Sequence, residues 1–126
     1  MRKQFIGAAL AAIAAGLAVA PAHAQAPGQS CFYSNQWTSW KAPNDHTIFL
    51  NVGNRVYRLD LASSCPTLNM GDATLITNNH SAQICSAIDW DLHVRAGGGI
   101  TTGCIVSKMT QLTPAEIAAL PKDSRP

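Results

Sequence analysis

The chain has 126 residues, 47% of them hydrophobic and only 13% charged, and a formal net charge of +2. This length is enough for one small domain with its own core and too short for several. Nine basic and seven acidic residues are scattered along the chain. No basic patch therefore indicates nucleic-acid binding or electrostatic attachment to a membrane.

The N-terminal segment has the features of a cleavable secretion signal. Arg2 and Lys3 precede an uncharged run over residues 5–20 that is rich in alanine, and small residues stand at Ala22 and Ala24. The run is shorter than the roughly 20 strongly apolar residues that a transmembrane helix needs. We therefore expect cleavage after Ala24, a periplasmic or secreted protein of a Gram-negative bacterium, and no transmembrane segment in the mature chain.

Four cysteines are the strongest structural signal in the rest of the chain: Cys31, Cys65, Cys85 and Cys104. An even number of cysteines in an exported protein favours disulfides, and no Cys-x-x-Cys spacing indicates a zinc site or a redox motif. Three pairings are possible. We favour the nested pairing, Cys31–Cys104 with Cys65–Cys85, because it joins the ends of the domain and closes the loop in the middle of the chain. The other two pairings stay open.

The first predicted strand contains two tryptophans. Residues 36–41 are expected to form this short strand, and the turn-forming residues 42–45 to end it. Trp37 and Trp40 are three positions apart, so on a regular strand they point to opposite faces. One of them is then exposed and available to stack on a sugar or contact a partner protein, although packing in or beside the core is their more ordinary role.

The next segment predicts a β-hairpin. Residues 47–52 and 55–61 flank Gly53-Asn54, a two-residue loop suited to a primed turn because glycine accepts a positive φ. Pairing Val52 with Arg55 puts the apolar residues of both strands on one face. A slip of one residue would destroy that match, so the sequence predicts this register.

Four further short strands are predicted in the second half of the chain, between turn-forming sequences. They are expected at residues 73–77, 82–85, 90–94 and 103–108. The glycine-rich run 95–99 before the last of them suits a flexible hairpin loop or, alternatively, a backbone nest that binds an anion.

A short helix is predicted near the C-terminus. Residues 113–116 have an N-cap threonine, a proline at the first helical position and a capping-box glutamate, and Pro121 ends the helix. Ile117 and Leu120 form its apolar face, so we expect the helix to lie as a lid on the sheet.

The segment 89–93 is the clearest candidate for chemistry. Its alternation puts Asp89, Asp91 and His93 on one face of the predicted strand, where they are able to hold a divalent metal or activate a water molecule. The same alternation is found on the solvent side of any half-buried strand, which needs no function. A histidine cluster would require His46 and His80 to join His93 across the fold.

Several features spread over the mature chain carry a family resemblance. They are Cys31 soon after the signal, the strand 56–61 leading to Cys65 and Leu68, Ile84-Cys85 before Asp89, and Cys104-Ile105-Val106 before residues 112–116. In these the chain resembles a family of small secreted Gram-negative proteins described as a domain of unknown function. The resemblance implies a compact disulfide-linked β-rich domain and no assigned catalytic residue; it singles out Asp89, for a turn-capping or a functional role.

The predicted fold is all-β and mainly antiparallel: a small barrel or sandwich of six to seven short strands with a short C-terminal helix and two disulfides. Residues 25–30 are expected to form a disordered leader, residues 31–121 the domain and residues 122–126 a tail. The leading hypothesis is a non-catalytic binding or inhibitor-like module that acts on a periplasmic or envelope component, without a cofactor. The alternative is a small metal-dependent or acid/base hydrolase that uses Asp89, Asp91 and His93.

Overall fold

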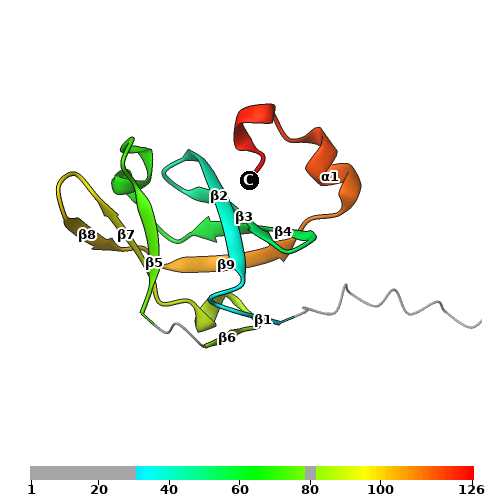
Figure 1. Cartoon of the computed structure of the whole chain (residues 1–126), viewed down its shortest axis with the longest axis horizontal. Helices are drawn as coiled ribbons and strands as arrows, with labels where there is room; N and C mark the ends of the chain where they lie inside the picture. The colour runs from blue at the N-terminus through cyan, green and yellow to red at the C-terminus, as the bar shows by residue number, and fades with distance from the viewer. Residues whose placement is uncertain (1–30, 79–81) are drawn as a thin grey trace, which may run out of the picture.

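The computed structural model describes residues 31–78 and 82–126 (Figure 1). The predicted signal, the predicted leader and His80 lie outside these residues. The described part contains nine strands in three antiparallel sheets, one short α-helix and three 3₁₀ turns. The all-β class is confirmed, with more strands than expected and with a sandwich-like arrangement in place of a closed barrel.

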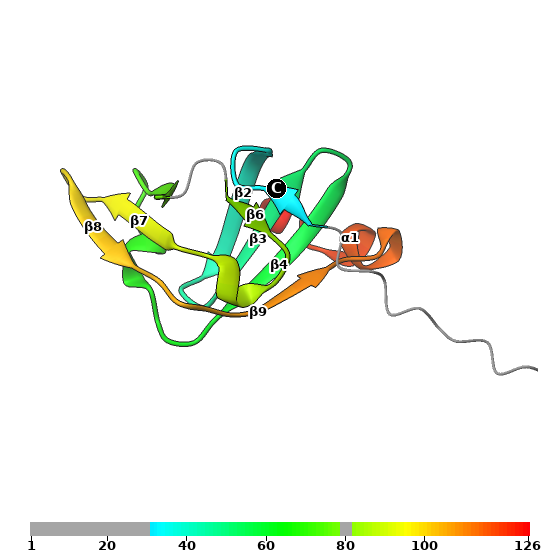
Figure 2. The same ribbon diagram turned by 90° about the horizontal axis from the view of Figure 1, so that it is seen from below.

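The larger sheet has the strand order β2-β3-β4-β9 and the second sheet has the order β5-β7-β8. The larger one consists of β2 (Trp37–Asn44), β3 (Thr47–Val52), β4 (Arg55–Leu61) and β9 (Val106–Gln111). The second consists of β5 (Thr74–Thr77), β7 (Leu92–Ala96) and β8 (Ile100–Gly103), and a small ribbon pairs β1 (Phe32–Tyr33) with β6 (Gln83–Ile84). Figure 2 shows the extended chain of β8 and β9 passing from the second sheet into the larger one.

The β3–β4 hairpin forms in the predicted register, with Val52 opposite Arg55. Gly53 has a φ of +63°, whereas Asn54 has no positive φ. A positive φ at the first central position alone is what a type II′ turn requires, and glycine adopts it without steric cost. The hairpin prediction is therefore confirmed in both its turn and its pairing.

The hydrophobic core gathers side chains from all three sheets. Its most deeply buried members are Phe32, Ile48, Leu50, Tyr57, Leu59, Ile84 and Val94. Burying a side chain of this size stabilises a fold by about 1.5–3 kcal/mol relative to leaving it in water. The core thereby fixes the positions of β7 and β9, the strands that carry the candidate site.

Two predicted strands differ in extent. β2 continues to Asn44 instead of ending at residue 41. It accommodates Pro43 because β2 is an edge strand of its sheet, where a missing N–H breaks no ladder. In the second half, Ala87–Asp89 form a 3₁₀ turn, η2, so the strand β7 begins at Leu92 and not at residue 90.

The single strand predicted at residues 103–108 is two strands, because the chain changes sheets at Cys104-Ile105. The N–H of Cys104 donates to the carbonyl of Leu92 at 2.9 Å, which continues the pairing of β8 with β7. The carbonyl of Ile105 accepts instead from the N–H of Ala62, also at 2.9 Å, which begins the pairing with β4. From this point the chain diverges from β7.

The disulfides are Cys31–Cys85 and Cys65–Cys104, so the favoured nested pairing is wrong. The pairing of strands explains the difference. Cys31 precedes β1 and Cys85 follows β6, and the antiparallel β1–β6 ribbon brings them together. Cys65 follows β4 and Cys104 precedes β9, which are likewise antiparallel neighbours. Each disulfide therefore closes the end of a strand pair.

The C-terminal helix α1 (Pro114–Ala119) has the predicted capping box. The Thr113 hydroxyl accepts from the N–H of Glu116, and the Glu116 carboxylate accepts from the N–H of Thr113. None of its residues is buried, so α1 is not the expected lid on the sheet. The 3₁₀ turn η3 (Lys122–Ser124) follows it and lies against β2.

A third 3₁₀ turn, η1 (Pro66–Asn69), connects β4 to β5 and packs against β7. It buries Thr67 and Leu68. None of the helices in residues 31–78 and 82–126 has the length and apolar character that crossing a membrane requires.

Candidate functional site

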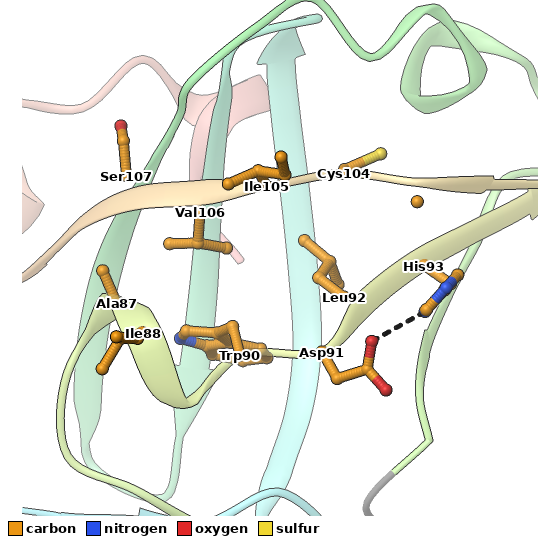
Figure 3. Close-up of a pocket in the computed structure, with 11 residues that line it drawn as sticks. Ala87, Ile88, Trp90, Asp91, Leu92, His93, Cys104, Ile105, Val106 and Ser107 are labelled. Carbon is orange, nitrogen blue, oxygen red and sulfur yellow. Dashed lines mark ion pairs between the residues drawn. The ribbon is translucent and has the colours of Figure 1, made fainter.

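A groove of about 610 Å³ opens where β7 and the β8–β9 segment diverge (Figure 3). One wall is η2, with Ala87 and Ile88, and the opposite wall is the segment 104–107. Figure 3 shows the Val106 side chain directed from this second wall toward Trp90, with Leu92 close to Trp90 as well. We call this hollow the η2–β9 groove; its position follows from the sheet change at Cys104-Ile105.

Two isoleucines stand exposed on opposite walls of the groove. Ile88 is 90% exposed and Ile105 is 69% exposed. The floor between them is apolar as well, since Leu92 and Val106 are buried core residues. Exposed apolar side chains gathered around a hollow mark binding surfaces more often than scattered ones do.

Trp90 joins the η2 wall to the core. Its indole Nε1–H donates to the sulfur of Met109 on β9 at 3.4 Å, and its ring meets the edge of Phe32 at 6.0 Å between centroids. These contacts hold η2 against β9 and the core.

The polar end of the groove is formed by Asp91 and His93, together with the neighbouring Asn78. The Asp91 carboxylate accepts a hydrogen bond from the Asn78 amide nitrogen at 3.0 Å and lies 3.5 Å from His93 Nδ1. The same amide nitrogen lies 3.3 Å from His93 Nδ1. The His93 ring covers Gly103 on the adjacent strand, where a Cβ atom would lie 3.7 Å from Nε2.

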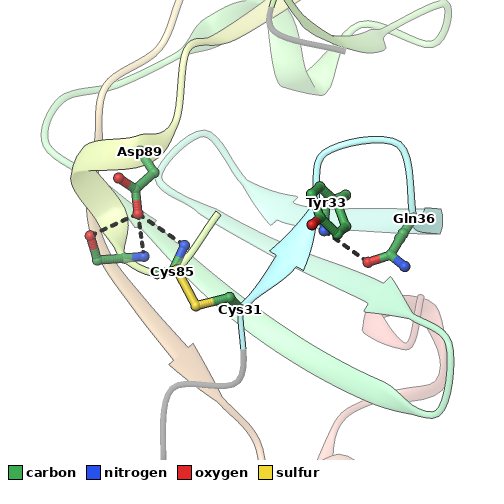
Figure 4. Close-up of a disulfide and its surroundings, with 6 residues drawn as sticks. Cys31, Tyr33, Gln36, Cys85 and Asp89 are labelled. Atoms are coloured by element: carbon green, nitrogen blue, oxygen red, sulfur yellow. Dashed lines mark hydrogen bonds between the residues drawn. A yellow bond between two sulfur atoms is a disulfide. The ribbon is translucent and has the colours of Figure 1, made fainter. Parts of the chain in front are cut away.

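Asp89 does not join Asp91 and His93, contrary to the predicted strand face. It caps η2: its Oδ2 atom accepts from the N–H groups of Cys85 and Ser86 and from the Ser86 hydroxyl (Figure 4). The bonds from the Cys85 and Ser86 N–H groups hold the pKa of Asp89 below its usual value. Asp89 is therefore a structural cap, one of the two roles the resemblance left open.

The disulfide Cys31–Cys85 ties η2 to the small ribbon (Figure 4). Cys85 lies immediately before Ser86, the residue that begins the turn. On the opposite wall, Cys104 lines the groove and is bonded to Cys65. Both walls are thus covalently fixed to other parts of the domain.

The two tryptophans of β2 share a face, so the expectation that they point to opposite faces is wrong. The register of β2 shifts between Trp37 and Ser39, so Trp37 lies opposite Val52 and Trp40 opposite Leu50. Val52 and Leu50 are two positions apart on β3 and both belong to the core. Trp37 and Trp40 are half-buried against that core and form no free aromatic platform.

The remaining histidine in the described part lies in a different environment. His46 Nδ1 is 2.7 Å from Asp45 Oδ1, and the Ser64 hydroxyl donates to the same carboxylate. These two side-chain hydrogen bonds, the one from Ser64 first, lower the pKa of Asp45. The serine contacts the carboxylate and not the imidazole, so the three do not form the nucleophile–base pair of a serine hydrolase.

The glycine-rich run 95–99 does bind an anion, but the anion is internal. The N–H of Gly97 donates to both carboxylate oxygens of Asp72, at 3.1 and 2.9 Å. This bond lowers the pKa of Asp72. Across residues 31–78 and 82–126, no three metal-ligating side chains lie close enough together to hold a metal ion.

Comparison with known proteins places the chain in a family. A family model described as a family of unknown function, DUF6491, matches residues 3–126. The chain belongs to this family. No curated protein and no solved structure matches the DUF6491 chain significantly.

Sequence reasoning missed two groove residues of this DUF6491 protein, Ile88 and Ile105, and the neighbouring Asn78. Ile88 lies between Ser86 and Asp89, and the spacing of these two residues is that of a capping box. That signal marks a helical turn at Ser86 and so leaves Ile88 on a turn, outside any strand. Asn78 and Ile105 carry no such signal, because only the pairing of β5 with β7 and the sheet change after β8 bring them to the groove.

Proposed function

We propose that this protein is an exported, non-catalytic binding module that holds an apolar part of a protein or other envelope component in the η2–β9 groove. The exposed pair Ile88 and Ile105 carries this proposal. The two isoleucines are exposed to water on either side of an apolar floor. Burial of their apolar surface against a partner stabilises the complex by about 25 cal/mol per Å².

The rigidity of the walls supports a binding role. A groove whose shape is set by a capped turn, two disulfides and the Trp90–Met109 contact loses little conformational entropy when a partner binds. Among the described residues, Ser107 is the one serine that lines the groove; its hydroxyl donates to the carbonyl of Asp60, and Figure 3 shows it away from Asp91 and His93.

Export to the periplasm or the medium of a Gram-negative cell is part of the proposal. Two disulfides are typical of proteins that fold in an oxidising compartment. The N-terminal sequence adds a basic start, a short apolar run and small residues before Ala24. The partner is therefore sought among periplasmic and envelope components.

The test compares three forms of the mature protein as bait for a periplasmic and envelope extract: wild type, the double variant Ile88→Asp with Ile105→Asp, and Ile100→Asp. Ile100 is the matched control, because it is an isoleucine 56% exposed on β8 that does not line the groove. We expect a component that wild type and Ile100→Asp retain and the double variant releases, with all three forms melting alike by circular dichroism. If all three forms retained the same components equally, the proposal would be wrong.

A further inference from the structure

The seven acidic side chains of the protein differ in their hydrogen-bond and ion-pair partners. Five have structural partners: Asp45 binds His46 and Ser64, Asp60 binds Arg58, Asp72 binds Gly97, Asp89 caps η2 and Glu116 caps α1. Asp123 lies exposed on η3, away from the groove. Asp91 alone among the seven lines the η2–β9 groove.

Asp91 brings a carboxylate to the groove, and among the described residues it forms an ion-pair contact with His93 Nδ1, at 3.5 Å, and with no lysine or arginine. Its side chain is 46% exposed, and the charged or titratable group nearest to it is His93. The Asn78 amide nitrogen donates to the Asp91 carboxylate at 3.0 Å and lies 3.3 Å from His93 Nδ1.

No lysine or arginine lines the groove, and Asp91 is the one residue of its lining that is acidic. The groove therefore offers an anion at one end and the two exposed isoleucines beyond it. A ligand that matches both features has a cation next to an aliphatic group.

We infer that the partner enters the groove as an extended peptide segment with an aliphatic side chain and an arginine or lysine on the same face. The aliphatic side chain packs between Ile88 and Ile105, and the cation pairs with Asp91. Residues two apart in an extended chain share a face, so the two side chains stand at positions i and i+2. This inference rests on the proposed function and specifies the ligand of the same groove.

The test measures the affinity of blocked pentapeptides for the ¹⁵N-labelled mature protein by NMR. The three probes are Gly-Leu-Ser-Arg-Gly and its analogues with glutamine or glutamate in place of arginine. Dissociation constants are read from the backbone amides of residues 87–93 and 103–107 and from the indole N–H of Trp90. We expect the arginine peptide to bind about fivefold more tightly than the glutamine peptide, as for an exposed ion pair, and the glutamate peptide to bind most weakly.

Two variants with the same change of net charge separate a local from a general effect. Asp91→Asn should remove the preference for arginine over glutamine and leave the affinity for the glutamine peptide unchanged. Asp123→Asn should keep the wild-type preference, because that carboxylate lies on η3 outside the groove.

The outcomes distinguish the two proposals. Equal affinities of wild type for the arginine and glutamine peptides, or an arginine preference that persists in Asp91→Asn, overturn the cationic ligand and leave the groove as an apolar binding site. Binding of the peptides to the Ile88→Asp and Ile105→Asp double variant as strong as to wild type overturns the proposed function. If no peptide shifts any groove signal, both are wrong.

Discussion

Two short helical segments, η2 and α1, begin with the same local device and end in different surroundings. Each has a capping box, formed by Ser86 with Asp89 in η2 and by Thr113 with Glu116 in α1. η2 packs against β9 and follows a disulfide-bonded cysteine. α1 buries none of its residues.

The difference shows that a capping box decides where a turn begins but not how firmly the turn is held. The position of η2 is set by contacts that are distant in sequence: the Cys31–Cys85 bond and the Trp90–Met109 contact. α1 is held at its end by a neighbour in sequence, because the Arg125 guanidinium donates to the carbonyls of Ala118 and Leu120. A wall of a binding groove needs the first kind of support.

Removal of the Cys31–Cys85 disulfide should have the largest effect, and it should affect η2 more than α1. The bond spans 54 residues, so the chain-entropy model gives a loss of about 4 kcal/mol in the free energy of unfolding for the Cys31→Ala and Cys85→Ala double variant. Urea unfolding measures the loss. Because η2 follows Cys85 directly, hydrogen exchange of the amides of residues 86–90 should accelerate more than that of residues 114–119.

The second disulfide provides the control. Cys65–Cys104 spans 39 residues, so the matching double variant should lose a similar amount of global stability, again about 4 kcal/mol. In this second variant, amide hydrogen exchange of residues 86–90 should differ less from that of the rest of the domain than it does after loss of Cys31–Cys85. If loss of Cys31–Cys85 accelerated amide exchange in α1 as much as in η2, the proposed anchoring of η2 would be wrong.

The pairing of the cysteines and the groove are the parts of the structure that could not be predicted from the sequence. Spacing alone does not reveal that β1 pairs with β6, and that pairing decides the partner of Cys31. The groove likewise depends on the sheet change at Cys104-Ile105, where the chain leaves β7 for β4. Both are contacts between residues far apart in sequence.

Local signals succeeded where two of them agreed. In the β3–β4 hairpin the turn residues and the apolar alternation specify the same register, and the structure has it. At η2 two signals disagreed. The alternation of Trp90, Leu92 and Val94 favours a strand that reaches back to Asp89, whereas the spacing of Ser86 and Asp89 favours a turn. The turn forms because the Asp89 carboxylate binds two backbone N–H groups there.

Asp89→Asn should weaken η2 in a manner that depends on pH. The folded-state pKa of Asp89 is lowered, chiefly by the N–H of Cys85, so its carboxylate stabilises the fold above the pKa of the unfolded chain. That stabilisation is lost as the pH falls through the folded-state pKa. We therefore expect the variant to unfold at lower urea concentration than wild type at pH 7 and the gap to close in acid.

Asp123→Asn is the control for this experiment, because it removes one negative charge from η3, and the hydrogen bonds that cap η2 do not involve Asp123. It should unfold like wild type at both pH values. A gap for Asp89→Asn that stayed constant down to strongly acidic pH would mean that the asparagine disturbs packing and that the charge of Asp89 contributes nothing.

Thr113→Ala, which removes the cap of α1, should have a smaller effect on stability than the loss of the Asp89 cap of η2. The substitution removes the hydroxyl that accepts from the N–H of Glu116 at 3.2 Å, a cap worth about 1 kcal/mol or less of helix stability. Because α1 buries none of its residues, the loss should appear as faster amide exchange in residues 114–119, with the urea midpoint nearly unchanged. Peptide affinity of the η2–β9 groove should not change either. A fall in the urea midpoint as large as that of Asp89→Asn at pH 7 would show that α1 supports the fold as much as η2 does, because only a helix coupled to the core transmits the loss of its cap to global unfolding.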